Sequence, residues 1–308
     1  MKLFHSLLYP LLGGLFCLSC SDDEQDTGTK QPTTAGEVTF GVDLTGFSTR
    51  VTQDGSSWND GDKIGTYVLD MKTLEPVTEA ANVPYVCSEE GASVSFTSTT
   101  PLKVQNDGTP VKFVAYYPYN ADVRNFNYPV QLAAQERGST ACDLLYAATK
   151  EEYTYSPENE PHISLNFTHR LAKVILKFVN MEKEPLEVSD VRIEGMQTAA
   201  SFNIQTDVLT VDESSVATIN PYHNATTGFY EAIILPSALT DSYKVSFVLD
   251  DREKEWIFTN LDIALPQFHK GYSYTFALYI DDSGFVEMGR LENCLLYTSP
   301  SPRDSTSS

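Results

Sequence analysis

The sequence predicts an all-β fold, organised as two antiparallel β-sandwich domains in tandem. Tyr (17) and Phe (16) are plentiful, and short stretches of alternating apolar and polar residues are separated by Gly, Pro, Asn and Asp. No stretch keeps a helical period, and strands do not alternate with helices, which favours antiparallel sandwiches over a parallel sheet. At 308 residues the chain is long enough for two ordinary domains.

Residues 37–160 are expected to form the first sandwich. Val38, Phe40 and Val42 alternate with polar or small residues up to residue 44, which predicts a strand with one buried face. Turn-forming Asp-Gly pairs follow, and further strands are predicted at residues 64–69, 93–97 and 111–117.

Residues 161–293 are expected to form the second sandwich. The polar, proline-bearing segment 149–161 is the candidate passage between the domains, with the break near residue 160. Strands are predicted at residues 163–167, 171–179, 187–194, 200–204, 228–235, 243–250, 256–261 and 273–280.

The N-terminal end is predicted to lie outside the fold. Residues 1–19 place an apolar stretch after Lys2 that is too short and too interrupted for a transmembrane helix, which indicates a signal peptide. Leu18-Ser19-Cys20 resembles a lipobox, so Cys20 is the candidate lipidation site; an ordinary secretory signal with a chance cysteine is the alternative. Residues 20–36 are expected to form a flexible tether, since residues 21–36 have no aliphatic side chain larger than Ala.

The C-terminal residues 294–308 differ abruptly in character from the residues before them. The string CLLYTSPSPRD resembles translated adapter sequence of metagenomic assemblies, so this stretch is expected to be an artefact that leaves the second sandwich truncated. A natural tail rich in Ser and Pro is the alternative.

The charge balance and the motifs point away from nucleic-acid binding and catalysis. With 42 acidic against 21 basic residues, the surface should repel polyanions. No nucleophile motif or phosphate-binding loop is present, and His162 and His169, expected to lie seven apart on one strand, should point to opposite faces. We expect no catalytic residue, metal site or cofactor.

Two cysteines of the predicted first domain are candidates for a disulfide. Cys87 and Cys142 could pair after export and stabilise this domain by roughly 2–5 kcal/mol. Separate buried thiols are the alternative.

Four strings, in this order, resemble the fimbrillin family of Bacteroidales-type fimbriae. They are SWNDGDKIGTYV (57–68), VKFVAYYPY (111–119), DLLYA (143–147) and LNFTHRLAKVILKF (165–178). The resemblance covers about residues 37–292. It implies two transthyretin-like domains on a lipid anchor, a location at the outer membrane surface in a fimbria, and a structural or accessory role rather than an enzyme. The implied partners are other fimbrial subunits, the outer membrane through the anchor, and surface ligands of host or bacteria.

The resemblance also implies an assembly mechanism. Members of the family donate a strand, from the C-terminus, into the open groove of a neighbour, and several are trimmed by an arginine-specific protease. Arg50 closely follows the predicted strand 38–44, so a cut after it would release that strand and expose the groove. Arg50 is therefore the candidate processing site; the alternative is a loop arginine in a subunit that is never cut.

Two other classes of function remain open at this stage. A monomeric surface lipoprotein that binds glycans would need an aromatic platform, and because Trp58 belongs to a structural turn, exposed tyrosines such as Tyr116, Tyr117 or Tyr119 would have to supply it. A surface hydrolase is suggested by the compartment alone.

Overall fold

The computed structural model describes residues 35–43, 58–78, 81–91, 93–135, 138–158, 160–261, 264–283 and 286–296. These residues fall within one compact unit, and apart from the four-residue 3-10 helix η1 (Ser139–Cys142) the regular elements among them are strands. The predicted all-β class is confirmed. Within the described ranges no helix is long and apolar enough to cross a membrane.

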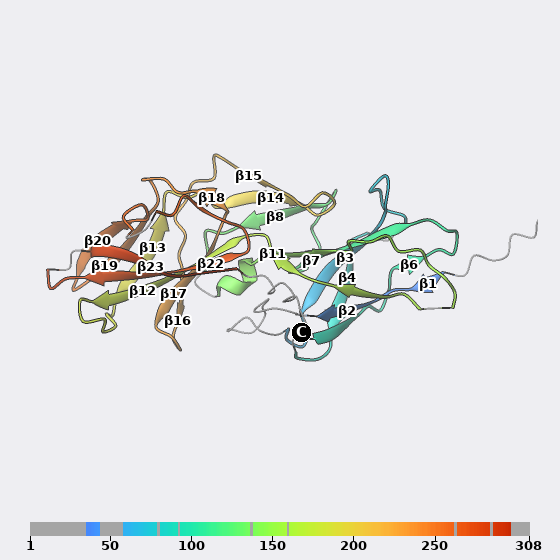
Figure 1. The fold of residues 1–308 in the computed structure, drawn as a ribbon, viewed down its shortest axis with the longest axis horizontal. Helices are drawn as coiled ribbons and strands as arrows, with labels where there is room; N and C mark the ends of the chain where they lie inside the picture. Colours follow the sequence, from blue (N-terminus) through green and yellow to red (C-terminus); the bar gives the residue numbers. More distant parts are fainter. Residues whose placement is uncertain are drawn as a thin grey trace, which may run out of the picture. The chain divides into compact units, whose positions relative to one another are not determined.

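The first large sheet has eight strands in the order β10-β2-β5-β4-β3-β7-β9-β11. Of these, β2, β3, β4, β7 and β11 are labelled in Figure 1. All neighbours are antiparallel except β10 and β2, which run parallel. The strands are β2 (Thr39–Asp43), β3 (Lys63–Asp70), β4 (Val83–Cys87), β5 (Ser93–Thr97), β7 (Val111–Tyr117), β9 (Leu145–Ala148), β10 (His162–Leu165) and β11 (Thr168–His169). Strands β1 (Gly36–Glu37) and β6 (Lys103–Val104) form a separate small antiparallel pair.

Apolar side chains on one face of the first sheet form a hydrophobic cluster. Trp58 is one of its buried members, and its ring lies edge-on to those of Phe96 (5.1 Å), Tyr117 (5.3 Å) and Phe167 (5.5 Å). The sheet continues to residue 169, past the break expected near residue 160, because β10 pairs with β2 and β11 pairs with β9. The boundary between the two expected domains stays a prediction.

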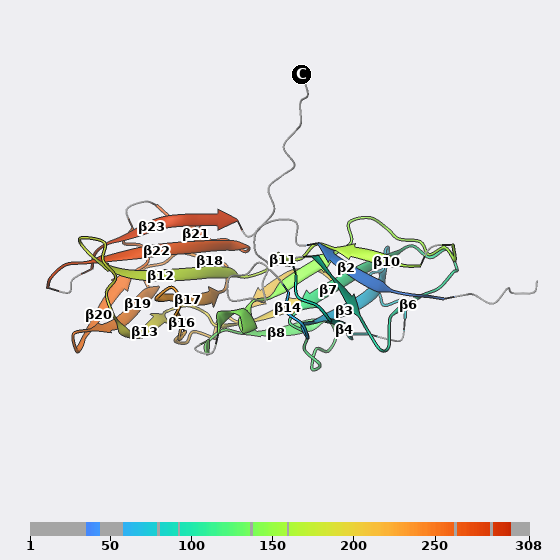
Figure 2. The same cartoon turned by 90° about the horizontal axis from the view of Figure 1, so that it is seen from below.

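The second half of the chain forms a five-stranded sheet that packs on a three-stranded sheet. The first has the order β16-β17-β12-β22-β23 and the second β13-β19-β20, and Figure 2 shows β12, β22 and β23 side by side. Their bounds are β12 (Ala172–Asn180), β13 (Ser189–Glu194), β16 (Tyr222–Asn224), β17 (Phe229–Ile234), β19 (Lys244–Leu249), β20 (Arg252–Ile257), β22 (Tyr272–Ile280) and β23 (Val286–Leu296). A further pair joins β18 (Ser237–Ala238) and β21 (Gln267–Phe268).

A third sheet joins segments from both halves of the chain. Strand β8 (Asn127–Gln131) pairs with β14 (Ala199–Asn203), which pairs in turn with β15 (Val208–Val211). Beneath it lies a separate hydrophobic cluster that includes Tyr116 and Tyr146 from the first sheet, Phe202 from β14 and Ile233 from β17. The halves therefore share a sheet and a core, which the strand pattern did not predict.

Two predicted elements differ from the structure. The strand expected at 256–261 is β20, which already starts at Arg252 because Asp250 and Asp251 adopt positive φ angles (48° and 60°) and close a tight hairpin. Strand β23 runs on to Leu296 and thus includes residues 294–296, which were expected to lie outside the fold.

Candidate functional site

Strand β2 lies between two neighbours in the first sheet and contributes a row of buried side chains. It pairs with β5 on one side and with β10 on the other. Val38, Phe40 and Val42 are essentially inaccessible to solvent, and the Phe40 ring meets those of Tyr85 (4.8 Å) and Phe113 (5.9 Å) edge-on. If β2 were removed, the facing edges of β5 and β10 would be exposed, together with an apolar groove between them.

Further hydrogen bonds hold the segment that leads into β2. The Val38 amide donates to the Leu102 carbonyl and the Thr39 amide to the Pro161 carbonyl, each at 2.9 Å. The hydroxyl of Tyr85 donates to the Val38 carbonyl at 3.0 Å and accepts from the Leu102 amide at 2.8 Å. Burial raises the pKa of Tyr85 to about 12, so this hydroxyl keeps its proton at neutral pH.

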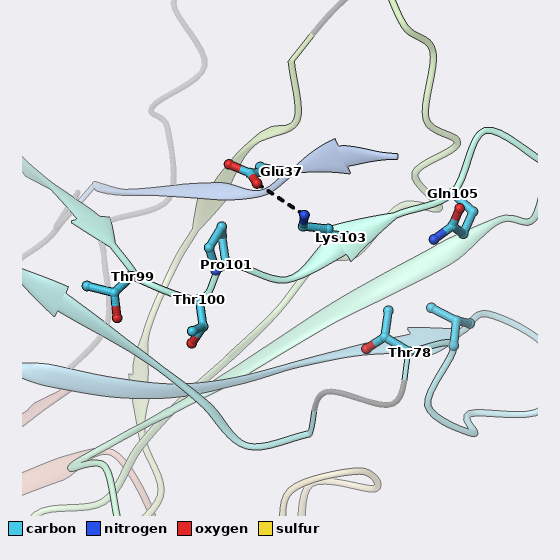
Figure 3. Close-up of a pocket in the computed structure, with 8 residues that line it drawn as sticks. Glu37, Thr78, Thr99, Thr100, Pro101, Lys103 and Gln105 are labelled. Atoms are coloured by element: carbon cyan, nitrogen blue, oxygen red, sulfur yellow. Dashed lines mark ion pairs between the residues drawn. The ribbon is translucent and has the colours of Figure 1, made fainter. Parts of the chain in front are cut away.

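An open groove lies beside the β1–β6 pair. It has a volume of about 680 Å³ and is lined by Val77, Thr78, Thr99, Thr100, Pro101, Gln105, Glu37 and Lys103. Figure 3 shows Glu37 and Lys103 facing one another from adjacent strands, with their charged atoms 3.3 Å apart. Both side chains are more than half exposed, so their ion pair adds little to the stability of the fold.

Two glycines in this segment lie directly against aromatic rings. A Cβ atom at Gly36 would come within 2.4 Å of Tyr155, and one at Gly41 within 2.6 Å of Nε2 of His162. The other ring nitrogen of His162 lies 3.1 Å from the hydroxyl of Thr39. These contacts leave no room for a side chain at either glycine unless the ring moves.

The structure describes only some of the predicted site residues. Cys20 and Arg50 lie outside the described residues, so lipidation and processing stay predictions. Cys87 and Cys142 are both free: Cys87 is buried in the cluster around Trp58, whereas Cys142 packs against the cluster shared by the two halves. Their disulfide also stays a prediction.

Two of the three tyrosines proposed for a glycan platform are buried and not available for stacking. Tyr116 is fully buried and Tyr117 is 8% exposed, while Tyr119 packs against the shared cluster. Trp58 and Trp256 are also buried. No aromatic platform is formed by these residues.

The histidines do not lie together. His162 is exposed on β10 and His169 is buried on β11, so they occupy two short strands rather than one continuous strand as expected. His169 forms a buried pair with Asp143 at 2.8 Å. Within the described ranges, no group of three or more His, Cys, Asp or Glu side chains is placed to hold a metal ion.

Gly41 and Lys103 were not singled out in the sequence, and His162 was considered only together with His169, as a pair expected to point to opposite faces. The one available signal was the glycine within an otherwise regular strand pattern, which often marks a close approach by another group. Nothing in the sequence indicated that His162, more than a hundred residues away, would be that group.

The model of the family described as fimbrillin-like matches residues 49–291. No curated protein matches the chain.

Solved structures with the same fold come from Bacteroides species. A candidate cell adhesion protein of Bacteroides uniformis superimposes with a TM-score of 0.68 at 21% identity, covering 89% of this chain and 100% of that chain. A candidate cell adhesion protein of Bacteroides ovatus gives 0.63 at 15% identity, covering 88% and 100%. A fimbrial protein of Bacteroides vulgatus gives 0.51 at 14% identity, covering 84% and 99%.

Proposed function

Because the chain belongs to the fimbrillin-like family, we propose that it is a surface-exposed fimbrial subunit that assembles by strand donation. In this proposal it has two transthyretin-like sandwich domains, is tethered to the outer membrane by a lipid on Cys20, and supports adhesion through the fimbria. Its partners are other fimbrial subunits, and the role is structural rather than enzymatic.

The observation that carries the proposal is the position of β2. This strand lies inside the sheet, between β5 and β10, and is the first strand of that sheet along the chain. It fills the core with Phe40 and its two valine neighbours. A strand that precedes the other strands of its sheet along the chain, yet has a neighbour on each side, can be separated by one cut and replaced by an equivalent strand from another molecule.

Arg50 is the proposed point of that cut. It follows the last residue of β2, Asp43, by seven positions, so a cut there would separate β1 and β2 from the rest of the sheet. The vacated groove would then be walled by β5, β10 and β6, with Tyr85 and Phe113 at its base.

Intact mass after treatment with an arginine-specific protease tests this proposal. We expect one major cut that leaves a fragment starting at Val51, followed by oligomers on size-exclusion chromatography when the chain carries a C-terminal donor strand. The Arg50→Lys variant removes only the recognised residue and should stay whole and monomeric. A main fragment that starts anywhere else, or a chain that is never cut, would contradict processing at Arg50.

Lipidation at Cys20 is tested separately in cells. Wild type should incorporate a labelled fatty acid and sediment with membranes, whereas Cys20→Ala should do neither. Equal labelling of both proteins would contradict the proposed anchor.

A monomeric glycan-binding role is disfavoured. Its proposed platform depends on exposed tyrosines, but Tyr116 and Tyr117 are buried in the structure.

A further inference from the structure

We infer that the groove occupied by β2 selects its donor strand by residue class, with the buried socket of Tyr85 and Phe113 requiring an aromatic residue at the position of Phe40 and His162 favouring a glycine at the position of Gly41. This inference rests on the proposed function, because it needs β2 to be replaced by a strand from a second subunit. It specifies the partner strand, which strand donation alone leaves undefined.

The outward row of the segment β1–β2 supplies the first criterion. Glu37, Thr39 and Gly41 alternate with the buried side chains and so lie on the opposite face of the strand. His162 lies over this row, with Nδ1 3.1 Å from the Thr39 hydroxyl and Nε2 2.6 Å from where a Cβ on residue 41 would stand. A donor strand with any larger residue at this position must displace the ring or lose its pairing with β10.

The inward row supplies the second criterion. Phe40 fills a socket formed by the rings of Tyr85 and Phe113, and no solvent reaches it. A smaller residue at this position would leave a cavity lined by these two rings. The socket therefore selects an aromatic or similarly large apolar side chain immediately before the glycine.

The ends of the groove add two weaker criteria. Tyr155 lies so close to Gly36 that only a small residue fits there. Lys103 loses its partner Glu37 when the segment leaves, so an acidic residue at that position of the donor would restore the ion pair. Because Lys103 is exposed, this contact should affect register more than affinity.

The inferred partner strand therefore has a defined pattern in seven consecutive positions. In the numbering of residues 36–42, the pattern has a small residue at 36, an acidic residue at 37 and an apolar residue at 38. Position 39 can be any residue, and an aromatic residue at 40, a glycine at 41 and an apolar residue at 42 follow. Such a strand would fill each socket and restore the backbone pairing with both β5 and β10.

Peptide binding to the opened chain tests the inference. A recognition sequence for a site-specific protease, placed within residues 44–57 of the full chain, allows the segment before it to be cut and exchanged. The probe is a fluorescent peptide with the sequence of residues 36–43, and fluorescence anisotropy measures its affinity. We expect this peptide to bind, and its Phe40→Ala form to bind at least about 100-fold more weakly.

The glycine criterion is tested by a peptide and protein pair. The Gly41→Leu peptide should bind at least about 10-fold more weakly to the chain with His162, and His162→Ala in the protein should restore most of that loss. The Asp43→Asn peptide is the matched control, because it changes the one position of the peptide that lies beyond the register of residues 36–42, and it should bind within about threefold of the original.

The outcomes separate the inference from the proposed function. If the cut chain neither releases its segment nor binds the original peptide, strand exchange itself is wrong. If the original peptide binds but Gly41→Leu binds equally well, or His162→Ala gives no rescue, the selection by His162 is wrong while strand exchange stands.

The uncut chain offers a second test that does not depend on release. Gly41→Leu should lower the melting temperature, and His162→Ala in the same chain should recover most of the loss. A Gly41→Leu chain as stable as wild type would overturn the steric argument.

Discussion

Gln135 and Ile233 are joined by two hydrogen bonds across the two halves of the chain. The side-chain amide of Gln135 donates to the Ile233 carbonyl at 2.7 Å, and its oxygen accepts from the Ile233 amide at 2.8 Å. The same amide also donates to the Leu132 carbonyl at 2.7 Å. Gln135 is 1% exposed, so its side chain extends the edge of β17 as a neighbouring strand would.

Replacing Gln135 by Glu should therefore destabilise the whole chain. The carboxylate cannot donate a hydrogen bond, so the buried carbonyls of Leu132 and Ile233 lose their donor, and a negative charge is buried. We expect the free energy of unfolding to fall by at least about 2 kcal/mol. Chemical denaturation measures this loss. Gln131→Glu, the same change at an exposed position on β8, is the control and should lie within about 0.5 kcal/mol of wild type. Equal stability of the two variants would contradict the bridging role.

A buried ion pair in the second half gives another prediction. Nζ of Lys173 on β12 lies 2.5 Å from Glu231 on β17, whose other oxygen accepts from the amide of Asn224 at 2.9 Å. Lys173→Met leaves Glu231 without its cation and should cost about 3–5 kcal/mol, whereas Lys173→Met with Glu231→Leu should cost less than the single change. A double-mutant cycle in urea measures the coupling.

The exposed pair Glu37–Lys103 is the control for this cycle. Lys103→Met should cost at most about 1 kcal/mol, since both side chains are solvated. Similar losses for Lys173→Met and Lys103→Met would contradict the role assigned to burial.

Buried tyrosines predict how stability depends on pH. Burial raises the pKa of Tyr67, Tyr85, Tyr128 and Tyr146 to about 12, compared with about 10 in an unfolded chain. The folded state thus holds these protons more tightly, so their contribution to stability is complete below pH 10 and is lost as the pH rises from 10 through 12.

Ultraviolet titration of tyrosinate, followed together with circular dichroism, measures this dependence. We expect these four tyrosines to keep their protons at pH 10 and to ionise together with unfolding at higher pH. Ionisation of all 17 tyrosines near pH 10 without loss of structure would contradict the burial of these side chains.

Much of the strand layout could be predicted from alternation, because a strand with one buried face has a period of two. The strands expected at 93–97 and 111–117 coincide with β5 and β7. β8 was missed because Pro129 interrupts its pattern, and the structure places this strand at the edge of its sheet, where a proline is tolerated.

The pairing of distant segments could not be predicted in the same way. The parallel pairing of β10 with β2 and the antiparallel pairing of β8 with β14 both depend on which edges meet in three dimensions. The contact between His162 and Gly41 follows from the pairing of β10 with β2. The sequence therefore predicted the strand β2, but not that His162 would lie against it.

A disulfide lock on β2 tests strand release most directly. Val42 and Val94 lie directly opposite on the antiparallel strands β2 and β5, where Cα atoms about 4.5–5.5 Å apart are within range of a disulfide. Val42→Cys with Val94→Cys is introduced into a chain that carries a C-terminal donor strand and whose other cysteines are replaced by alanine. This protein is treated with the arginine-specific protease and followed by size-exclusion chromatography. We predict that the oxidised protein stays monomeric after cutting and forms oligomers once reduced, whereas the single-cysteine controls form oligomers in both states. Equal oligomer formation by the oxidised and reduced double variant would contradict assembly through the groove of β2.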